Sequence, residues 1–237
     1  MNPRTTGVLA VCLALVVPRG LGAEYTDKKG FYVIGDVGAN FVQKLAFERI
    51  QGVDATGSAS VEVHPGVRGT VGVGYAFLPQ LAAELEGGFA YNETKTYSGV
   101  VGGVPLNGSI RLWHVPVTAG LTWRPPIPPP TPPSDADIQY GQQIFQRVHP
   151  FIGAGIGAAA VFGDIDIPAP TANGQIGSGR DTVLTYYAKA GLMFPLNSRT
   201  EIGVQYRFYG STGFTIKDTR SDDIFAHAVS VALRIRF

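Results

Sequence analysis

The last thirteen residues of the chain alternate between large apolar side chains and small or charged ones, and this alternation restricts the possible folds more than any other feature. The apolar parity holds Phe225, Val229, Val231, Leu233, Ile235 and Phe237. The other parity holds Ala226, Ala228, Ser230, Ala232, Arg234 and Arg236. Because successive side chains of a strand point to opposite faces, the segment predicts a strand with one apolar and one polar face. A half-buried strand of a soluble protein would look the same, so the rest of the chain must decide.

Seven earlier segments repeat the pattern. The predicted strands cover residues 31–41, 67–77, 81–91, 110–124, 151–162, 182–194, 199–210 and 225–237. A transmembrane strand needs about 9–11 residues, and these segments supply them. Strands can span a bilayer only when every backbone group is paired within the protein, as in a closed barrel. The sequence therefore predicts an all-β fold, an eight-stranded antiparallel up-and-down transmembrane β-barrel.

The predicted connections alternate between long and short. Long loops at 42–65, 92–109, 163–181 and 211–224 fall on one side, with a possible short helix at 41–50, whereas tight turns at 78–80 and 195–198 fall on the other. Pro116 cannot donate to a ladder, so a bulge or local break is expected there. Seven prolines between 125 and 133 predict a stiff, extended spacer over about 125–147.

The first 23 residues have the layout of a secretory signal peptide, with Arg4, an apolar run from Val8 to Val17 and small residues before Glu24. Cys12, the only cysteine, lies within that run and would be lost on cleavage. We therefore expect a signal peptide at 1–23 and one barrel domain at 24–237. Removal of Arg4 and Arg19 would change the formal net charge from +1 to −1.

Composition excludes several classes of protein. No run of about 18 apolar residues follows the predicted signal peptide, which excludes an ordinary helical membrane protein. A nearly neutral chain has no field that would favour nucleic acid, so no nucleic-acid partner is expected. A soluble barrel of lipocalin type would place its large apolar residues inside, whereas here they share the predicted outer face. Aromatic residues near both ends of the strands predict two interfacial girdles.

Charged residues gather on the inward parity of the predicted strands. The set is Asp36, Arg68, Glu84, Glu86, His114, Lys189, Glu201, Arg207, Arg234 and Arg236. An ion path or an active site is one interpretation. An eight-stranded barrel is only wide enough to be filled by its own side chains, and charges kept from water must be paired. We therefore predict a structural salt-bridge network that plugs the lumen, with Arg234 and Arg236 as partners of Glu84, Glu86 and Glu201.

The remaining candidate motifs indicate no chemistry. The four histidines, His64, His114, His149 and His227, have no ligand spacing, so no metal is expected, and no cofactor or catalytic residue is assigned. The glycines at 153, 155 and 157 precede no helix and are not a phosphate loop; they suit a narrow lumen.

The chain resembles the small eight-stranded outer-membrane β-barrel proteins of Gram-negative bacteria, the OmpA-like and OmpX-like barrels and surface antigens. The resemblance rests on the signal peptide, on Phe31-Tyr32-Val33, on Val115-Pro116-Val117 and on the terminal Phe237. It implies an outer-membrane location, Phe237 as part of a signal read by the assembly machinery, contact with outer-membrane lipid and lipopolysaccharide, and a monomer. The Pro-rich connection departs from the short turn that is usual in that family.

The expected function is a structural or surface-interaction role, with the four long loops available to an extracellular ligand. A narrow pore is the first alternative. Lipid A modification is the second, because some members of the family use a membrane-facing Ser/His arrangement. His227 and Ser230 are three residues apart, however, and so face opposite sides of the last strand.

Overall fold

The computed structural model describes residues 29–43, 45–50, 53–61, 63–93, 97–101, 104–125, 148–166, 177–216 and 219–237. The predicted signal peptide at 1–23 and all but the first residue of the Pro-rich connection at 125–147 lie outside the described residues. Within the described ranges, no helix is long and apolar enough to cross a bilayer.

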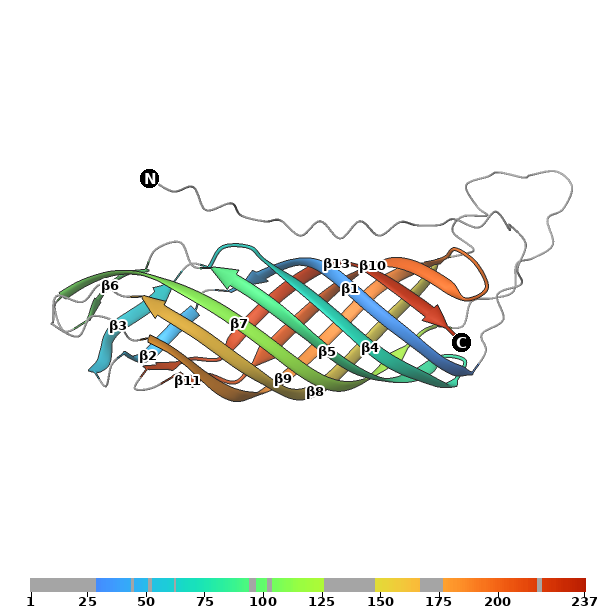
Figure 1. Cartoon of the computed structure of the whole chain (residues 1–237), viewed down its shortest axis with the longest axis horizontal. Coiled ribbons are helices and arrows are strands. Elements are labelled where there is room, and N and C mark those ends of the chain that lie inside the picture. Colours follow the sequence, from blue (N-terminus) through green and yellow to red (C-terminus); the bar gives the residue numbers. More distant parts are fainter. Residues whose placement is uncertain are drawn as a thin grey trace, which may run out of the picture.

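Eight of the described strands close into a barrel (Figure 1). They are β1 (Gly30–Val42), β4 (Gly66–Leu78), β5 (Leu81–Glu93), β7 (Val104–Trp123), β8 (His149–Asp166), β9 (Gly177–Pro195), β10 (Thr200–Ser211) and β13 (Ile224–Arg236). Each pairs antiparallel with the barrel strand that follows it in sequence, and β13 pairs with β1 to close the ring. The predicted eight-stranded, all-β, up-and-down barrel is confirmed.

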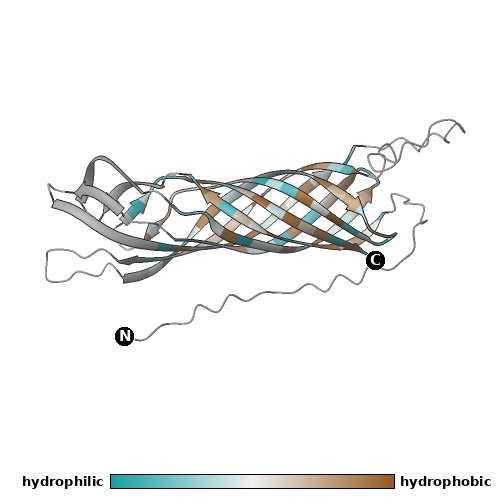
Figure 2. Cartoon of the chain, turned by 90° about the horizontal axis from the view of Figure 1, so that it is seen from above, coloured by the Kyte–Doolittle hydropathy of each residue, from teal (hydrophilic) through white to brown (hydrophobic). Residues whose placement is uncertain are grey.

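The two faces of the wall follow the predicted parity. Val37, Val231 and Val204 lie side by side on β1, β13 and β10, and they are 65%, 52% and 49% exposed. Their chain neighbours of opposite parity, such as Asp36 and Ala232, are buried inside the ring. Because of this register, the barrel is apolar outside and polar inside. Figure 2 shows hydrophobic and hydrophilic residues following one another along the barrel strands.

One end of the barrel carries tight connections, as predicted, and we call it the short-turn end. Pro79 and Gln80 alone separate β4 from β5. Between β9 and β10, the side chain of Asn197 accepts hydrogen bonds from the backbone of Arg199 and Thr200, both at 2.8 Å. The C-terminus lies at this end (Figure 1).

The opposite end carries extended strands where the sequence predicted loops, and we call it the long-hairpin end. The additional strands are β2 (Leu45–Ile50), β3 (Val53–Val61), β6 (Tyr97–Val101), β11 (Thr215–Ile216) and β12 (Thr219–Ser221). A four-stranded sheet has the order β11-β12-β2-β3, and β6 pairs with an extension of β7. The loop assignments at 42–65, 92–109, 163–181 and 211–224 were therefore too broad, because ladder pairing continues beyond the barrel wall.

The short helix predicted at 41–50 is wrong. β1 continues to Val42, and β2 then pairs with β3 on one side and β12 on the other. The local apolar spacing was compatible with a helix, but two ladders satisfy the backbone of this segment in the strand conformation, and tertiary pairing overrides local propensity.

Pro116 interrupts one ladder without shifting it. Its pairing with Ala159 of β8 is continuous, whereas the pairing of β7 with β5 stops at Val117 and resumes at His114 in the same register. The predicted local break is confirmed, and no bulge forms at this position. Proline has no N–H group to donate to a ladder, and here only the ladder with β5 is affected, where the pairs of Val115 and Pro116 are missing.

Candidate functional site

A column of alternating charges fills the lumen. Its members, in order, are Asp36, Arg207, Glu86, Lys189, Glu84, Arg234 and Glu201. Each is at most 8% exposed. They come from β1, β10, β5, β9 and β13, so the column ties together strands on different sides of the ring.

Lys189 lies between the two glutamates of β5. Its Nζ is 2.5 Å from Glu86 Oε1 and also forms an ion pair with Glu84. On the other side of Glu86, Arg207 Nη1 lies 2.6 Å from Oε2. Arg207 Nη2 reaches Asp36 Oδ2 at 3.7 Å, and Thr70 donates a hydrogen bond to the same oxygen. Glu84 and Glu86, two residues apart on β5, are thus bridged by one lysine.

Glu84 is also held by neutral groups. Tyr32 donates to Oε1 at 2.6 Å, and Thr122 donates to Oε2 at 2.8 Å. Arg234 Nη2 lies 3.7 Å from Oε1. A buried carboxylate is tolerated when it accepts several hydrogen bonds and has a cation close by, and Glu84 has both.

Glu201 ends the column near the short-turn end. Arg234 Nη1 and Arg124 Nη2 are both 3.1 Å from its Oε2, and His149 Nδ1 is 3.1 Å from its Oε1. Arg236 is more distant, at 3.7 Å. One carboxylate of β10 therefore contacts side chains from β8, from β13 and from the residue that follows β7.

Aromatic rings line the column and pack against glycines. The Arg207 guanidinium lies 4.4 Å from the centre of the Tyr187 ring, and that of Arg234 lies 4.7 Å from Tyr32. A Cβ on Gly155 would come within 2.5 Å of Tyr187 Cε1, so only glycine leaves room for this ring. The small inward residues of β8 were predicted to suit a narrow lumen, and at Gly155 the missing side chain makes room for the Tyr187 ring.

A second polar level lies beyond Asp36, toward the long-hairpin end. The Tyr209 hydroxyl contacts the ring of His114, and Asn40 donates to Asn92 at 2.7 Å. Arg68 is 5% exposed, and among the described residues no ion pair of its guanidinium is found and its Nε has no hydrogen-bond partner. Of the ten inward candidates, Arg68 is the one for which no ion pair or hydrogen bond with a described residue is found.

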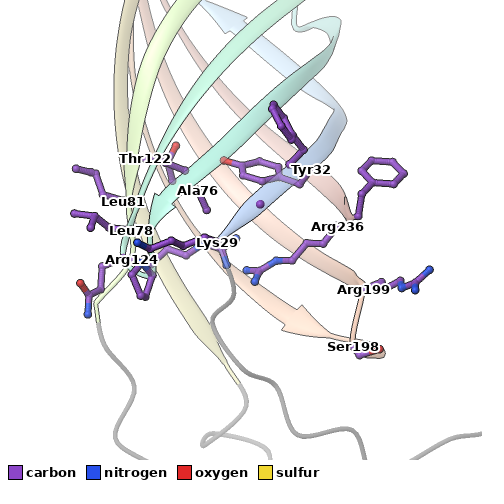
Figure 3. A pocket seen from close by; sticks show the side chains of 16 residues that line it. Lys29, Tyr32, Ala76, Leu78, Leu81, Thr122, Arg124, Ser198, Arg199 and Arg236 are labelled. Carbon is purple, nitrogen blue, oxygen red and sulfur yellow. The ribbon is translucent and has the colours of Figure 1, made fainter.

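At the short-turn end, the lumen opens into a cavity of about 340 Å³ (Figure 3). Tyr32 and Thr122 lie on its inner side, and the basic residues around it are Lys29, Arg124, Arg199 and Arg236. Its described lining contains no acidic residue. The column lies deeper than this cavity, since Glu201 is fully buried.

On the outer wall, Gln43 and Tyr206 contact the two ring nitrogens of His227 at 2.7 Å and 2.5 Å. Ser230 is buried on the lumen side. His227 and Ser230 are thus on opposite faces of β13. The residues that the structure describes include no cluster of three His, Cys, Asp or Glu side chains suited to a metal ion.

The structure places all ten inward candidates on the lumen side, and it brings nine of them into contact with a polar partner. Sequence reasoning missed Tyr32, Arg124 and His149. Tyr32 has the same parity as Asp36, and Arg124 has the same parity as Thr122. Counting every second residue from these inward positions could therefore have found both Tyr32 and Arg124. His149 was read as a scattered histidine because β8 begins two residues earlier than predicted.

The wall, the closed ring and the polar lumen agree with the comparison with known families. The sequence matches the family model described as outer membrane protein beta-barrel domain over residues 8–237. The chain belongs to the outer-membrane β-barrel family. The predicted transmembrane barrel is therefore confirmed, because a membrane-barrel family and a closed ring with an apolar exterior point to the same fold.

The chain is similar to several solved outer-membrane proteins at low sequence identity. OprG from Pseudomonas aeruginosa is 14% identical, with a TM-score of 0.55 over 89% of this chain and 98% of that one. Neisserial surface protein A is 12% identical, with a TM-score of 0.48 over 88% and 97%. The outer membrane protease OmpT from Escherichia coli is 8% identical, with a TM-score of 0.41 over 92% and 99%. No curated protein matches this outer-membrane β-barrel in sequence.

Proposed function

We propose that this protein is a closed outer-membrane barrel of a Gram-negative bacterium, with a structural or surface-interaction role. The observation that carries the proposal is the charge column, because it crosses the lumen with ion pairs between strands on different sides of the ring. An eight-stranded ring leaves room only for its own side chains, and here those side chains are bonded to one another. Such a lumen acts as a plug rather than a pore.

The long-hairpin end is the proposed interaction surface. External loops of outer-membrane barrels are long and periplasmic turns are short, so the sheet of β2, β3, β11 and β12 would face the outside. Residues 1–23 would direct export, Phe237 would be read by the assembly machinery, and outer-membrane lipid and lipopolysaccharide would surround a monomeric barrel. The proposal includes no catalytic reaction.

Conductance in planar bilayers tests the plugged lumen. We expect the purified protein to leave the conductance at that of lipid alone, because the column occupies the path. Stable single-channel steps in the wild type would contradict the plug and would favour the narrow pore. A folded Lys189→Met variant is the matched comparison. Because it removes the central cation of the column, its conductance should be higher than that of the wild type.

Surface labelling tests the orientation. The predicted mature chain has no cysteine, so single cysteines can be introduced at Asp222, which is exposed at the long-hairpin end, and at Ser198, which is exposed at the short-turn end. We expect a membrane-impermeant maleimide to label Asp222→Cys on intact cells and Ser198→Cys only after lysis. The reverse pattern would overturn the assignment of the outer face.

Loop deletion tests the interaction role. Cells that express the wild type or variants lacking β2 and β3, or β6, would be compared for binding to a panel of immobilised glycans and extracellular proteins. We expect the wild type to bind a member of the panel. One of the two deletions should abolish this binding, and the other should leave it unchanged. Equal binding by all variants and by cells without the protein would contradict the surface-interaction role, and only the structural role would then be supported.

A further inference from the structure

Arg68 is a buried cation that the charge column does not neutralise. The column contains four acids and three cations, and Arg124 provides a fourth cation at its Glu201 end. Arg236, 3.7 Å from the same carboxylate, is a fifth cation, so the four acids of the column already have at least as many cationic partners without Arg68. Asp36 lies on β1, which pairs with the strand of Arg68. Its Oδ2 already accepts a hydrogen bond from Thr70 and forms an ion pair with Arg207.

Asp36 and Glu86 of the column attract Arg68 from a distance, but no described carboxylate forms an ion pair with it. Among the described residues its guanidinium has no ion pair, and its Nε has no hydrogen-bond acceptor. The amides of Asn40 and Asn92 hydrogen-bond to each other, and Asn92 also donates to the backbone oxygen of His64 at 3.1 Å. A charge held in low dielectric without a partner is strongly disfavoured.

A small cavity adjoins this guanidinium. Its volume is about 30 Å³, and Arg68, Asn92, His114 and Tyr209 form its polar side. Its apolar side is Phe89, Leu112, Pro116, Ile224 and Ala226, together with Val42 and Ala90. A space of this size holds an ion or molecule about as large as one water.

We propose that Arg68 binds a monatomic anion of the halide class, with chloride as the natural ligand. The N–H groups of the guanidinium supply directed donors, the apolar residues strip water from the ion, and the anion cancels the charge that the column leaves over. The site lies in the lumen between Asp36 and the hairpins of the long-hairpin end, and it is separate from the proposed interaction surface.

Anion-dependent stability tests the site. The refolded protein would be unfolded in urea in sodium chloride, sodium bromide or sodium fluoride at constant ionic strength, so that general screening is equal in all three. We expect chloride and bromide to raise the urea midpoint in a saturable manner, because an ion that binds only the folded state stabilises it in proportion to occupancy. Fluoride, which is strongly hydrated, should raise the midpoint least.

Matched variants separate the site from a general salt effect. Arg68→Met removes the guanidinium and keeps an apolar stem, so the halide dependence should disappear. Arg180→Met removes an exposed arginine from the same end of the barrel and should retain it. Equal halide dependence in the two variants, or none in the wild type, would overturn the proposal, the latter indicating that the cavity holds water.

A direct readout does not depend on stability. Bromide-soaked crystals of the wild type should show an anomalous peak beside the Arg68 guanidinium, and crystals of Arg68→Met should not. A wild-type crystal without such a peak at saturating bromide would contradict the site even if the urea midpoint were salt-dependent.

Discussion

Lys189 is the residue on which the interior depends most directly. It lies between Glu84 and Glu86 and is 3% exposed, so both acids rely on the same ammonium group. A buried ion pair adds little when compared with an apolar pair of the same shape, but breaking it leaves a charge in low dielectric. The expected cost of a substitution therefore depends on what is left behind rather than on the contact that is lost.

Lys189→Met should lower the free energy of unfolding by about 3–5 kcal/mol, because it leaves two buried carboxylates without their shared cation. Urea unfolding in detergent micelles measures this. The double variant Lys189→Met/Glu86→Gln should lose less than the sum of the single changes.

The control is a salt bridge on the surface. Arg111 and Glu93 are 3.6 Å apart with side chains more than half exposed, so Arg111→Met should change stability by less than about 1 kcal/mol. If Lys189→Met and Arg111→Met proved equally mild, the column would have no energetic role.

At the scale of single strands, the sequence alone predicts which face meets lipid. The alternation in β13 and its partners assigns Val231 to the outside and Arg234 to the inside, and the exposed fractions agree. Alternation is a local property and is visible in a single chain. The order of the charges in the column was not predictable, because Lys189 meets Glu84 and Glu86 across the lumen and depends on the register of four strands.

The hairpin strands were harder to predict for a different reason. β2, β3 and β6 show little alternation, since the sheet beyond the wall has no bilayer to select apolar residues on one face. The sequence therefore read as loop at 42–65 and 92–109. The backbone pairing that makes these segments strands leaves no mark on composition.

Val231→Lys should lower stability by about 2–4 kcal/mol, because it places a charge on the lipid-facing row formed with Val37 and Val204. Folding titrations in lipid vesicles measure the change, and Val231→Leu is the control for altered shape. Full tolerance of lysine at this position would mean that the assigned faces are reversed.

Replacement of residues 44–64 by a short turn should leave the barrel intact. β1 and β4 pair from Gly30 and Ala76 up to Asn40 and Gly66 without help from β2 or β3. Circular dichroism and resistance to unfolding by detergent should match the wild type. Deletion of Gly72 alone, which shifts half of β4 by one residue and reverses its faces, should abolish folding.

Taken as a whole, the molecule is a ring closed between its first and last strands. β1 pairs with β13 from Tyr32 and Arg236 to Val42 and Ala226. Every barrel strand therefore has two neighbours, and no open edge faces lipid. This closure makes the barrel one cooperative unit rather than a sheet that can fray.

The closed ring should migrate differently on a denaturing gel before and after boiling. An unheated sample is expected to run as a compact species and a boiled one as an unfolded chain, because the paired ladder resists the detergent until heat opens it. Identical mobility in both samples would argue against a closed barrel.

The charge column also bears on the path by which the ring is built. Lys189, Arg207 and Arg234 reach their acids only when β5, β9, β10 and β13 stand around a common axis. In a partly formed sheet, the same side chains would face hydrocarbon without partners, at a high free energy. The column thus opposes insertion of incomplete sheets, so that entry into the membrane and closure of the ring become a single event.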